Sequence, residues 1–481
     1  MTSFAKAVVP HGTTSIVSGL DQYIVTAGLT GIREILDEID QGPLKVFWGL
    51  PFITPYTLPK SNVGFNVTAE THREVQKWPE VFGVWETVSE FIENQHDDVI
   101  KAIELARENR LPVFGCAPMT QGSRLNSVLC AGVRLDHESY DHQEMMEKVR
   151  KGMYVLIRES SISHFMHENL KIVTHLNPRI SRRVSFCTDD VTAADITRNG
   201  HMDKLVRMAI SCGVDPLTAI QMGSINSAEA YRVDHLVGSI SPGRFADILL
   251  VDDLRKFEID TVIAKGKLTV EGGKMVQDLQ PPVRSQTLLQ TMTLSSPIMP
   301  EDMQVKTDID APRVHALSLD VDYNVPFVRK GRQVELNVVN GVVQPDIDND
   351  VLYATVVERF GKTSTKPVVG FCSGWKLKAG AMASSCAPDD NNIICIGANS
   401  ADMAQAINYL AEQGGGQVII RDGEILGFLP LPICGIVSDL DPELMAIEED
   451  KLHAIARELG CDLPDPMFYM CCLQITAIPA F

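Results

Sequence analysis

Alternation of apolar, strand-like runs with helix-like segments across residues 1–228 constrains the fold of this chain more than any other feature. Runs of β-branched and other apolar residues predict buried strands at 13–17, 44–48, 81–84, 112–115, 154–157 and 183–186. Apolar residues at helical spacing predict helices over 29–39 and 97–110. So many strand–helix units in succession imply a parallel sheet of the (β/α) barrel type. The predicted fold class is therefore α/β, with this barrel over residues 1–228.

The pattern changes near Asn226, where shorter strands begin. Turn signals such as Ser241-Pro242-Gly243 predict a small β-sandwich segment over residues 229–285. A stretch rich in Pro, Ser and Thr after it predicts a linker. A carboxy-terminal α/β domain is predicted over residues 301–481, and Asp422-Gly423 is expected to turn a hairpin inside that domain. Three domains suit a chain of 481 residues, which is too long for one typical core.

Charge and composition exclude several classes of function. The net charge of −19 predicts an acidic surface that repels phosphate backbones, which argues against a nucleic-acid partner. No apolar run approaches the roughly 20 residues that cross a bilayer, and the first residues do not resemble a signal peptide. The 11 cysteines form no C-x-x-C pair, so we expect them to be reduced. These features predict a cytoplasmic protein that binds neither nucleic acid nor membrane.

Candidate catalytic side chains follow the predicted strands, because chemistry in a (β/α) barrel takes place at the carboxyl ends of its strands. His137 stands between Asp136 and Glu138. An imidazole flanked by carboxylates suits a metal ligand with supporting acids, and an ordinary solvated loop fits the pattern equally well. Asp189, after the strand at 183–186, suits a ligand or a general base, and the alternative is a cap on the following helix.

Two further strand ends carry groups that bind metals. Glu86 follows Gly83-Val84-Trp85 and is either a carboxylate ligand or a surface residue. Cys116 is either a thiolate ligand or, as lone buried cysteines more often are, a small apolar core residue. Such ligands matter because a bound cation lowers the pKa of a water molecule that then attacks the substrate. No His-x-His pair stands near the amino terminus to join them.

Four longer segments carry motifs. They are Cys187-Thr188-Asp189-Asp190 with Gly200-His201-Met202-Asp203, the segment 213–222, the segment 238–247, and the stretch 356–432 with its Gly427-Phe428-Leu429-Pro430-Leu431-Pro432. The third is shared broadly among metal-dependent amidohydrolases. Together the four resemble the adenine deaminases within that superfamily, and the last resembles a carboxy-terminal domain that distinguishes adenine deaminases from other amidohydrolases. The resemblance runs across nearly the whole chain.

The resemblance implies hydrolysis of adenine, a small-molecule purine, to hypoxanthine and ammonia at a manganese or iron centre. Carried onto this chain, it implies Glu86, His137 and Asp189 as metal ligands. Cys116 is a weaker candidate ligand, and a thiolate there would favour zinc. Asp189 would also exchange protons with the attacking water, and Glu159 is similar to a family residue near the substrate, so these two are the predicted catalytic residues. The resemblance and the exposed edge of an incomplete barrel predict a homo-oligomer.

Departures from the family pattern open a second hypothesis. We expect the family's amino-terminal segment to be missing, with its His-x-His pair, one barrel strand and half of the small β domain. Asp21, Cys116, Pro388 and Asn391 stand where the family has histidines. The chain is accordingly predicted to be an adenine deaminase-like aminohydrolase or, alternatively, an impaired or inactive homologue that acts as a purine-binding or assembly subunit. In the second case it would hold no metal.

Overall fold

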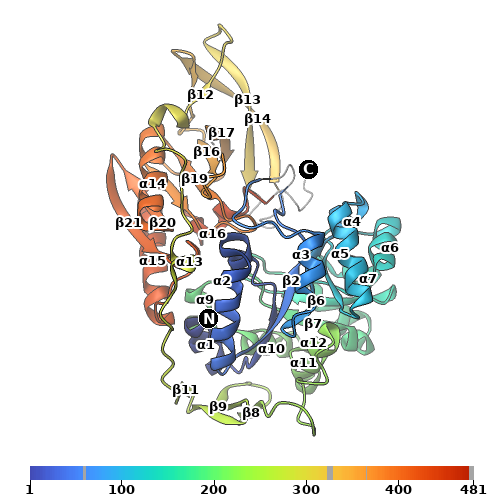
Figure 1. Ribbon diagram of the computed structural model, residues 1–481. Coiled ribbons are helices and arrows are strands. Elements are labelled where there is room, and N and C mark those ends of the chain that lie inside the picture. Colours follow the sequence, from blue (N-terminus) through green and yellow to red (C-terminus); the bar gives the residue numbers. More distant parts are fainter. Residues whose placement is uncertain (58–60, 322–328, 364–365, 476–481) are drawn as a thin grey trace.

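Parallel strands build the first domain in the computed structural model, which describes residues 1–57, 61–321, 329–363 and 366–475. Two parallel sheets follow chain order, β1-β2-β3-β4 and β5-β6-β7, and a parallel bridge between Val113 and Val133 joins them. The strands are β1 (Ser15–Ser18), β2 (Lys45–Pro51), β3 (Val81–Val88), β4 (Val113–Cys116), β5 (Leu135–Asp136), β6 (Tyr154–Arg158) and β7 (Val184–Cys187). With helices packed outside them, these strands confirm the predicted (β/α) barrel (Figure 1).

Helices cover the outer side of these strands. Helix α5 (Asp97–Glu108) shows why, because Val99, Ala102, Ile103 and Ala106 recur at helical spacing and are buried. The predicted helix over 29–39 is the second half of a longer helix, α2. The other helices are α1 (Thr2–Val8), α2 (Asp21–Gln41), α3 (Ala69–Val75), α4 (Ser89–Glu93), α6 (Gly122–Ala131), α7 (His142–Arg150), α8 (Met166–Asn169), α9 (Ala193–Asn199), α10 (Met202–Ser211), α11 (Pro216–Met222) and α12 (Ile225–Tyr231).

The sheet of the barrel is open between its first and last strands. Within the described ranges, β1 and β7 each pair with one strand only. The side chain of His201 spans this gap, because its Nδ1 lies 2.8 Å from Thr13 Oγ1, before β1, and its Nε2 lies 3.2 Å from Thr188 Oγ1, after β7. Polar side chains therefore connect the two edges where a strand pair would otherwise do so.

A small antiparallel sheet follows the barrel in the chain. Its order is β11-β10-β9-β8, so the predicted β-sandwich segment is a single four-stranded sheet among the described residues. Its strands are β8 (Ile248–Val251), β9 (Ile259–Ala264), β10 (Lys267–Glu271) and β11 (Lys274–Met275). An ion pair of 2.6 Å between Lys45 Nζ and Asp247 Oδ2 fastens this segment to the start of β2.

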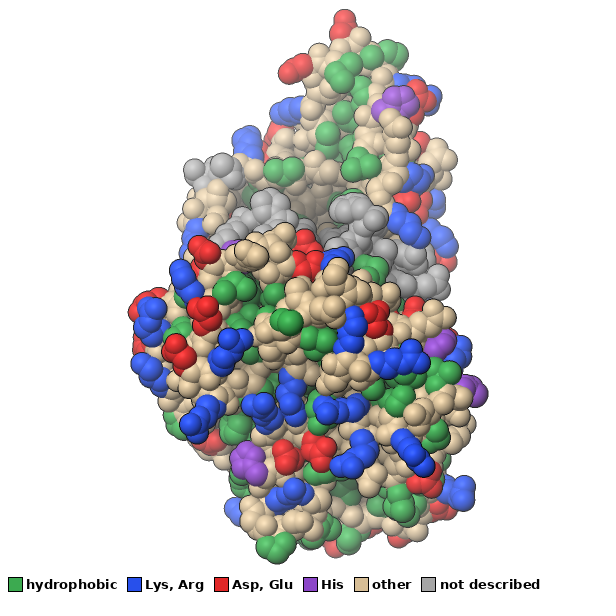
Figure 2. All heavy atoms as spheres, turned by 90° about the vertical axis from the view of Figure 1, so that its right-hand side faces the viewer, with side chains coloured by type: hydrophobic (Ala, Val, Ile, Leu, Met, Phe, Trp, Pro, Cys, Tyr) green, Lys and Arg blue, Asp and Glu red, His purple; other side chains and the backbone are tan. Residues whose placement is uncertain are grey.

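The carboxy-terminal domain is built on a ten-stranded sheet of order β12-β15-β14-β13-β17-β16-β19-β18-β20-β21. In Figures 1 and 2 the end that carries β12 and β13 forms a narrow lobe above the barrel. The predicted hairpin at Asp422-Gly423 is confirmed, since it joins β20 to β21. The strands are β12 (Val305–Lys306), β13 (Arg313–Val321), β14 (Arg329–Val339), β15 (Val342–Val343), β16 (Val351–Val357), β17 (Val368–Ser373), β18 (Ala381–Ser384), β19 (Ile393–Gly397), β20 (Gly416–Arg421) and β21 (Glu424–Pro430).

Helices flank this sheet and the connection that leads to it. Buried apolar side chains of α14 join the core that includes Ile393, Cys395 and Val418. The helices are α13 (Gln286–Leu289) in the connection, then α14 (Ser400–Gln413), α15 (Pro442–Glu458) and α16 (Pro466–Cys471). In the described part of the chain, no helix combines the length and the apolar character that crossing a bilayer requires.

An arginine of the connecting segment ties the two large domains together. Arg284 Nη1 lies 2.6 Å from Glu38 Oε2 on α2, and Arg284 Nη2 lies 2.7 Å from Asp439 Oδ1 in the carboxy-terminal domain. The amino-terminal nitrogen of Met1 adds a contact of 3.1 Å to Glu38 Oε1. We call Arg284, Glu38 and Asp439 the Arg284 cluster. The positive charges of Arg284 and the amino terminus therefore offset the negative charges of Glu38 and Asp439.

Candidate active site

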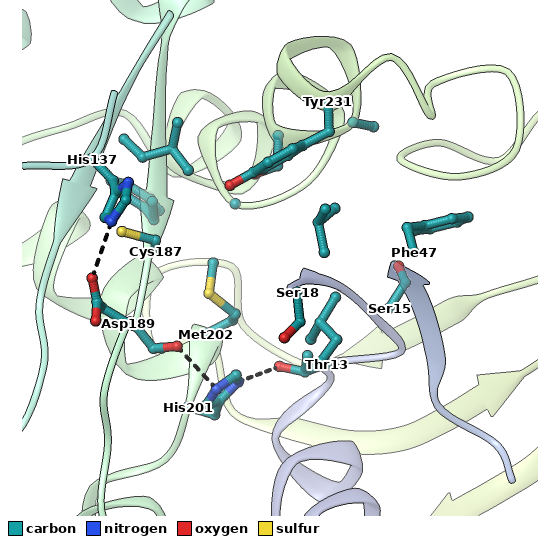
Figure 3. A pocket seen from close by; sticks show the side chains of 18 of the residues that line it. Thr13, Ser15, Ser18, Phe47, His137, Cys187, Asp189, His201, Met202 and Tyr231 are labelled. Carbon is teal, nitrogen blue, oxygen red and sulfur yellow. Dashed lines mark hydrogen bonds and ion pairs between the residues drawn. The ribbon is translucent and has the colours of Figure 1, made fainter. Parts of the chain in front are cut away.

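The three predicted ligands converge at the carboxyl ends of barrel strands. His137 Nε2 lies 3.4 Å from Glu86 Oε1 and 3.5 Å from Asp189 Oδ2. Figure 3 shows the His137 and Asp189 side chains pointing toward one another. Their side chains and that of Glu86 are 13%, 15% and 23% exposed, so water reaches the group only in part. One imidazole and two carboxylates from distant segments thus share one small space.

The backbone at two of these residues is unusual. Glu86 has φ 53° and Asp189 has φ 55°, in the left-handed region that residues other than glycine rarely adopt. Glu86 lies in a β-bulge, where the register of β3 against β4 shifts between Val84 and Thr87. Strain of this kind gathers at functional sites, where the surrounding structure maintains it. The side chain of Thr192 caps the following helix, α9, so the capping alternative does not account for Asp189.

Two charged residues that the sequence reasoning did not select complete this cluster. Glu138 Oε1 lies 3.6 Å from His137 Nε2 and accepts a hydrogen bond from Arg158 Nη1. Arg158 Nε lies 3.3 Å from Asp189 Oδ2, and Arg158 is only 2% exposed. The position of Arg158 at the end of a predicted apolar strand was the available signal. A buried arginine there requires carboxylate partners.

Burial and pairing oppose each other in the electrostatics of the cluster. Burial lowers the pKa of His137, but the carboxylates of Glu86, Glu138 and Asp189 outweigh it and raise this pKa well above its usual value. Burial raises the pKa of Asp189, but Arg158 and His137 outweigh it and lower that pKa. At Glu138 burial dominates over Arg158 and raises the pKa to about 7. The cluster therefore holds more negative charge than its own cations offset.

This donor set fits a divalent metal ion. Ligand atoms of His137, Glu138 and Asp189 lie within 4.8 Å of one another, and the same is true of Glu86, Cys116 and His137. The Glu138 Oε2 atom is buried and makes no hydrogen bond to any described residue. A cation would satisfy that oxygen and offset the surplus charge, and oxygen and imidazole ligands suit several divalent metals. The residues present are therefore consistent with a metal site.

The other two predicted site residues, Cys116 and Glu159, have different surroundings. Cys116 ends β4 and is buried beside Glu86, and burial raises the pKa of its thiol well above the usual value. This shift favours the neutral thiol over the metal-binding thiolate. The Glu159 carboxylate pairs with His164 Nδ1 at 2.8 Å and accepts a hydrogen bond of 3.2 Å from Met166 N, and Glu159 does not line the cavity described next. The metal role of Cys116 and the catalytic role of Glu159 remain predictions.

A cavity of about 650 Å³ opens beside the cluster, a size that suits a small-molecule ligand. Besides the barrel residues, Pro388 and Asp389 of the carboxy-terminal domain line it. Asp21 and Tyr56 line it from the barrel side. Burial, helped by Glu86, raises the pKa of Asp21 to about 8, and burial also raises the pKa of Asp389 well above its usual value. The sequence reasoning noted Asp21 and Pro388 only as positions where the family has histidines, and it did not select Tyr56 or Asp389.

Comparison with known proteins identifies the family of this chain. A model of the amidohydrolase family matches residues 1–269, and a model of the adenine deaminase C-terminal domain matches residues 327–481. Adenine deaminase 1 of Desulfotalea psychrophila is 58% identical over 481 residues, which cover 100% of this chain and 80% of that protein. The chain belongs to the adenine deaminase family. The resemblance drawn from the motifs is thereby confirmed.

Other adenine deaminases match over the same extent. Adenine deaminase 4 of Rhizobium meliloti is 55% identical over 481 residues, and an adenine deaminase of Clostridium botulinum is 34% identical over 485 residues. Each match covers 100% of this chain and 80% of the relative. By family the chain is a metal-dependent hydrolase, and amidohydrolase membership implies a divalent metal. Nothing in these comparisons favours the hypothesis of an impaired homologue.

Proposed function

We propose that this chain hydrolyses adenine to hypoxanthine and ammonia. In that reaction the oxygen of a water molecule bonds to C6 of the purine, and the bond from C6 to the amino nitrogen breaks. The observation that carries the proposal is the convergence of Glu86 and Asp189 on His137, at 3.4 Å and 3.5 Å, beside a cavity of about 650 Å³. The names of the relatives supply the substrate, adenine.

Glu86, His137 and Asp189 would hold the divalent cation, which when bound lowers the pKa of a water molecule. Asp189 is placed to accept a proton from the attacking water as a general base and to return it to the departing amino group. Arg158, 3.3 Å from Asp189 Oδ2, holds that carboxylate in one orientation. Glu159 would act on the substrate only indirectly, through the segment that follows β6.

The metal is proposed to be manganese or iron. Carboxylate and imidazole ligands from Glu86, Asp189 and His137 support this choice, because such mixed oxygen and nitrogen sets suit these ions. Zinc becomes the better candidate if the Cys116 thiol releases its proton to solvent and binds the metal as a thiolate. Metal analysis of protein expressed in media supplemented with one metal at a time separates these cases.

Metal content measured together with ammonia release tests the proposed function. Purified protein is expected to carry manganese or iron and to release ammonia from adenine with hypoxanthine as the other product. The Asp189→Asn variant is expected to keep its fold, by circular dichroism, and to lose turnover. Protein that is folded and metal-loaded but releases no ammonia from adenine would overturn the proposal and favour the purine-binding homologue.

A homo-oligomer and a cytoplasmic location are also proposed. The open edges of β1 and β7 support self-association, because unpaired strand edges invite pairing with another chain. All 11 cysteines are unpaired, which supports a reducing compartment. Light scattering of the purified protein tests the first proposal, and a monomer at micromolar concentration would contradict it.

A further inference from the structure

A buried lysine of α7 lies behind the strand end that carries His137. The side chains of Lys148 and Asp136 are both 0% exposed, and Asp136 immediately precedes His137 in the chain. Lys148 Nζ lies 2.8 Å from Asp136 Oδ2 and 2.6 Å from Glu144 Oε1. Lysine is almost never fully buried unless it is paired, and its loss would leave two buried carboxylates without their cation. The fold therefore keeps a buried ion pair directly beside a predicted metal ligand.

The Asp136 carboxylate links the end of β5 to the end of β4. Its Oδ1 accepts a hydrogen bond of 2.7 Å from the backbone N–H of Ala117, the residue that follows Cys116. Lys148 Nζ donates a hydrogen bond of 2.7 Å to the carbonyl oxygen of Ala117, so both backbone groups of that residue are engaged. Ser139 Oγ donates a further hydrogen bond of 2.8 Å to Asp136 Oδ2. One buried network thus joins the segments that follow β4 and β5.

Strand pairing alone does little to hold these two strand ends together. Among the described residues, β4 and β5 share a single bridge, between Val113 and Val133, and Val113 is the first residue of β4. Strand β5 has two residues, whereas β3, which carries Glu86, has eight. So short a strand has few backbone hydrogen bonds to fix the residue after it. A fully satisfied buried polar network rigidifies its surroundings, and here it supports what the short strand cannot.

We propose that Lys148 and Asp136 are positioning residues for His137, because their ion pair holds the end of β5 where His137 can bind the metal ion. The inference rests on the metal centre of the proposed function. Neither side chain lines the cavity, so both act through the backbone. Partners that orient metal ligands typically contribute roughly 10–100-fold to metal affinity. A pair that only stabilised the fold would leave the metal affinity of the folded protein unchanged.

Manganese binding to the folded protein tests this proposal. In Lys148→Met the dissociation constant for manganese(II), measured by competition with a fluorescent chelator, should rise roughly 10–100-fold. Lys45→Met is the matched control, because Lys45 is also buried and its 2.6 Å ion pair with Asp247 lies at the amino end of β2. Both variants should unfold at a lower temperature than the wild type. Only Lys148→Met should bind manganese more weakly and change the electron paramagnetic resonance spectrum of the bound ion.

The Ser139→Ala variant keeps the test decisive if Lys148→Met does not fold. It removes one hydrogen bond to Asp136 and leaves the ion pair in place, so its dissociation constant should rise by a smaller factor. The wild-type dissociation constant and spectrum in folded Lys148→Met, or in Ser139→Ala where Lys148→Met does not fold, would overturn the inference. Weaker binding in Lys45→Met as well would also overturn it, since any loss of a buried pair would then act alike.

The outcomes separate this inference from the proposed function. If the wild type binds no manganese, both the inference and the proposed manganese centre are overturned. If the wild type binds manganese and Lys148→Met binds it equally well, only the inference is overturned. If Lys148→Met binds manganese more weakly but the wild type releases no ammonia from adenine, the proposed function fails and the positioning role of Lys148 stands.

Discussion

Two of the places where charged residues of the carboxy-terminal domain meet the barrel have opposite electrostatics. In the Arg284 cluster, burial raises the pKa of Glu38, but hydrogen bonds from Arg284 and the charge of the amino terminus outweigh it and lower this pKa to about 2. At the cavity, burial raises the pKa of Asp21 to about 8, and that of Asp389 rises as well. The first junction has a cation for its carboxylates, and the second has a surplus of carboxylates. We infer that the first stabilises the fold and that the second is reserved for ligands.

Asp189→Asn is expected to have the largest effect, and on catalysis alone. Loss of a general base typically lowers turnover by roughly 10²–10⁴-fold. The kcat for adenine should fall by that factor, while the midpoint of thermal unfolding stays near that of the wild type. Asp253→Asn, at an exposed carboxylate, is the control. A variant that unfolds much earlier would show that Asp189 belongs with the stabilising junction instead.

Arg284→Ala should have the largest effect on stability. The change leaves the buried Glu38 without its main partner, and breaking such a pair costs about 3–5 kcal/mol of unfolding free energy. Urea denaturation measures the loss. The matched control is Arg313→Ala, whose ion pair with Glu335 is exposed and worth about 0–1 kcal/mol. Equal losses in the two variants would show that the Arg284 cluster stabilises the fold no more than an exposed ion pair does.

The pH dependence of stability should identify Glu38. Its pKa is about 2 in the folded protein and near 4.5 when unfolded, so the unfolded chain binds more protons at low pH. The stabilisation is therefore present above the unfolded pKa and is lost as the pH falls toward the folded one. Between pH 5 and pH 3 the wild type should lose about 1–2 kcal/mol more unfolding free energy than Glu38→Gln. Parallel curves for the two proteins would contradict this.

Asp21→Asn should have the smallest effect, of the opposite sign. The folded pKa of Asp21 is about 8, above its usual 3.8, so the buried carboxyl costs stability that grows as the pH rises between these values. An amide at this position does not have to take up a proton on folding, so the variant should be more stable at pH 7 by about 0.5–2 kcal/mol, as substitutions that relax functional sites often are. Thermal unfolding at pH 5 and pH 8 measures the gain, which should be larger at pH 8. A destabilised variant would place Asp21 among the structural residues.

Local pattern in the sequence was enough for the barrel and for part of the site. Alternating strand and helix signals predicted the parallel sheet, and strand ends predicted Glu86, His137 and Asp189, which lie together. The sequence pattern was less exact about which side of a helix is buried. In α5 the apolar Ile100 and Leu105 are not among the buried residues, which are Val99, Ala102, Ile103 and Ala106. Helical spacing limits which residues of a helix can be buried. The elements that pack against the helix decide which of those residues are buried.

What the sequence alone determined was the order of elements, the family and the residues that end each strand, because these depend on local spacing and on motifs within short segments. Only the tertiary structure decided that Arg158 pairs with Glu138, that Arg284 joins α2 to the carboxy-terminal domain, and that Asp389 reaches the barrel cavity. The physical reason is that these contacts join residues far apart in the chain. Their partners are set by how whole domains pack, and no local periodicity encodes that packing.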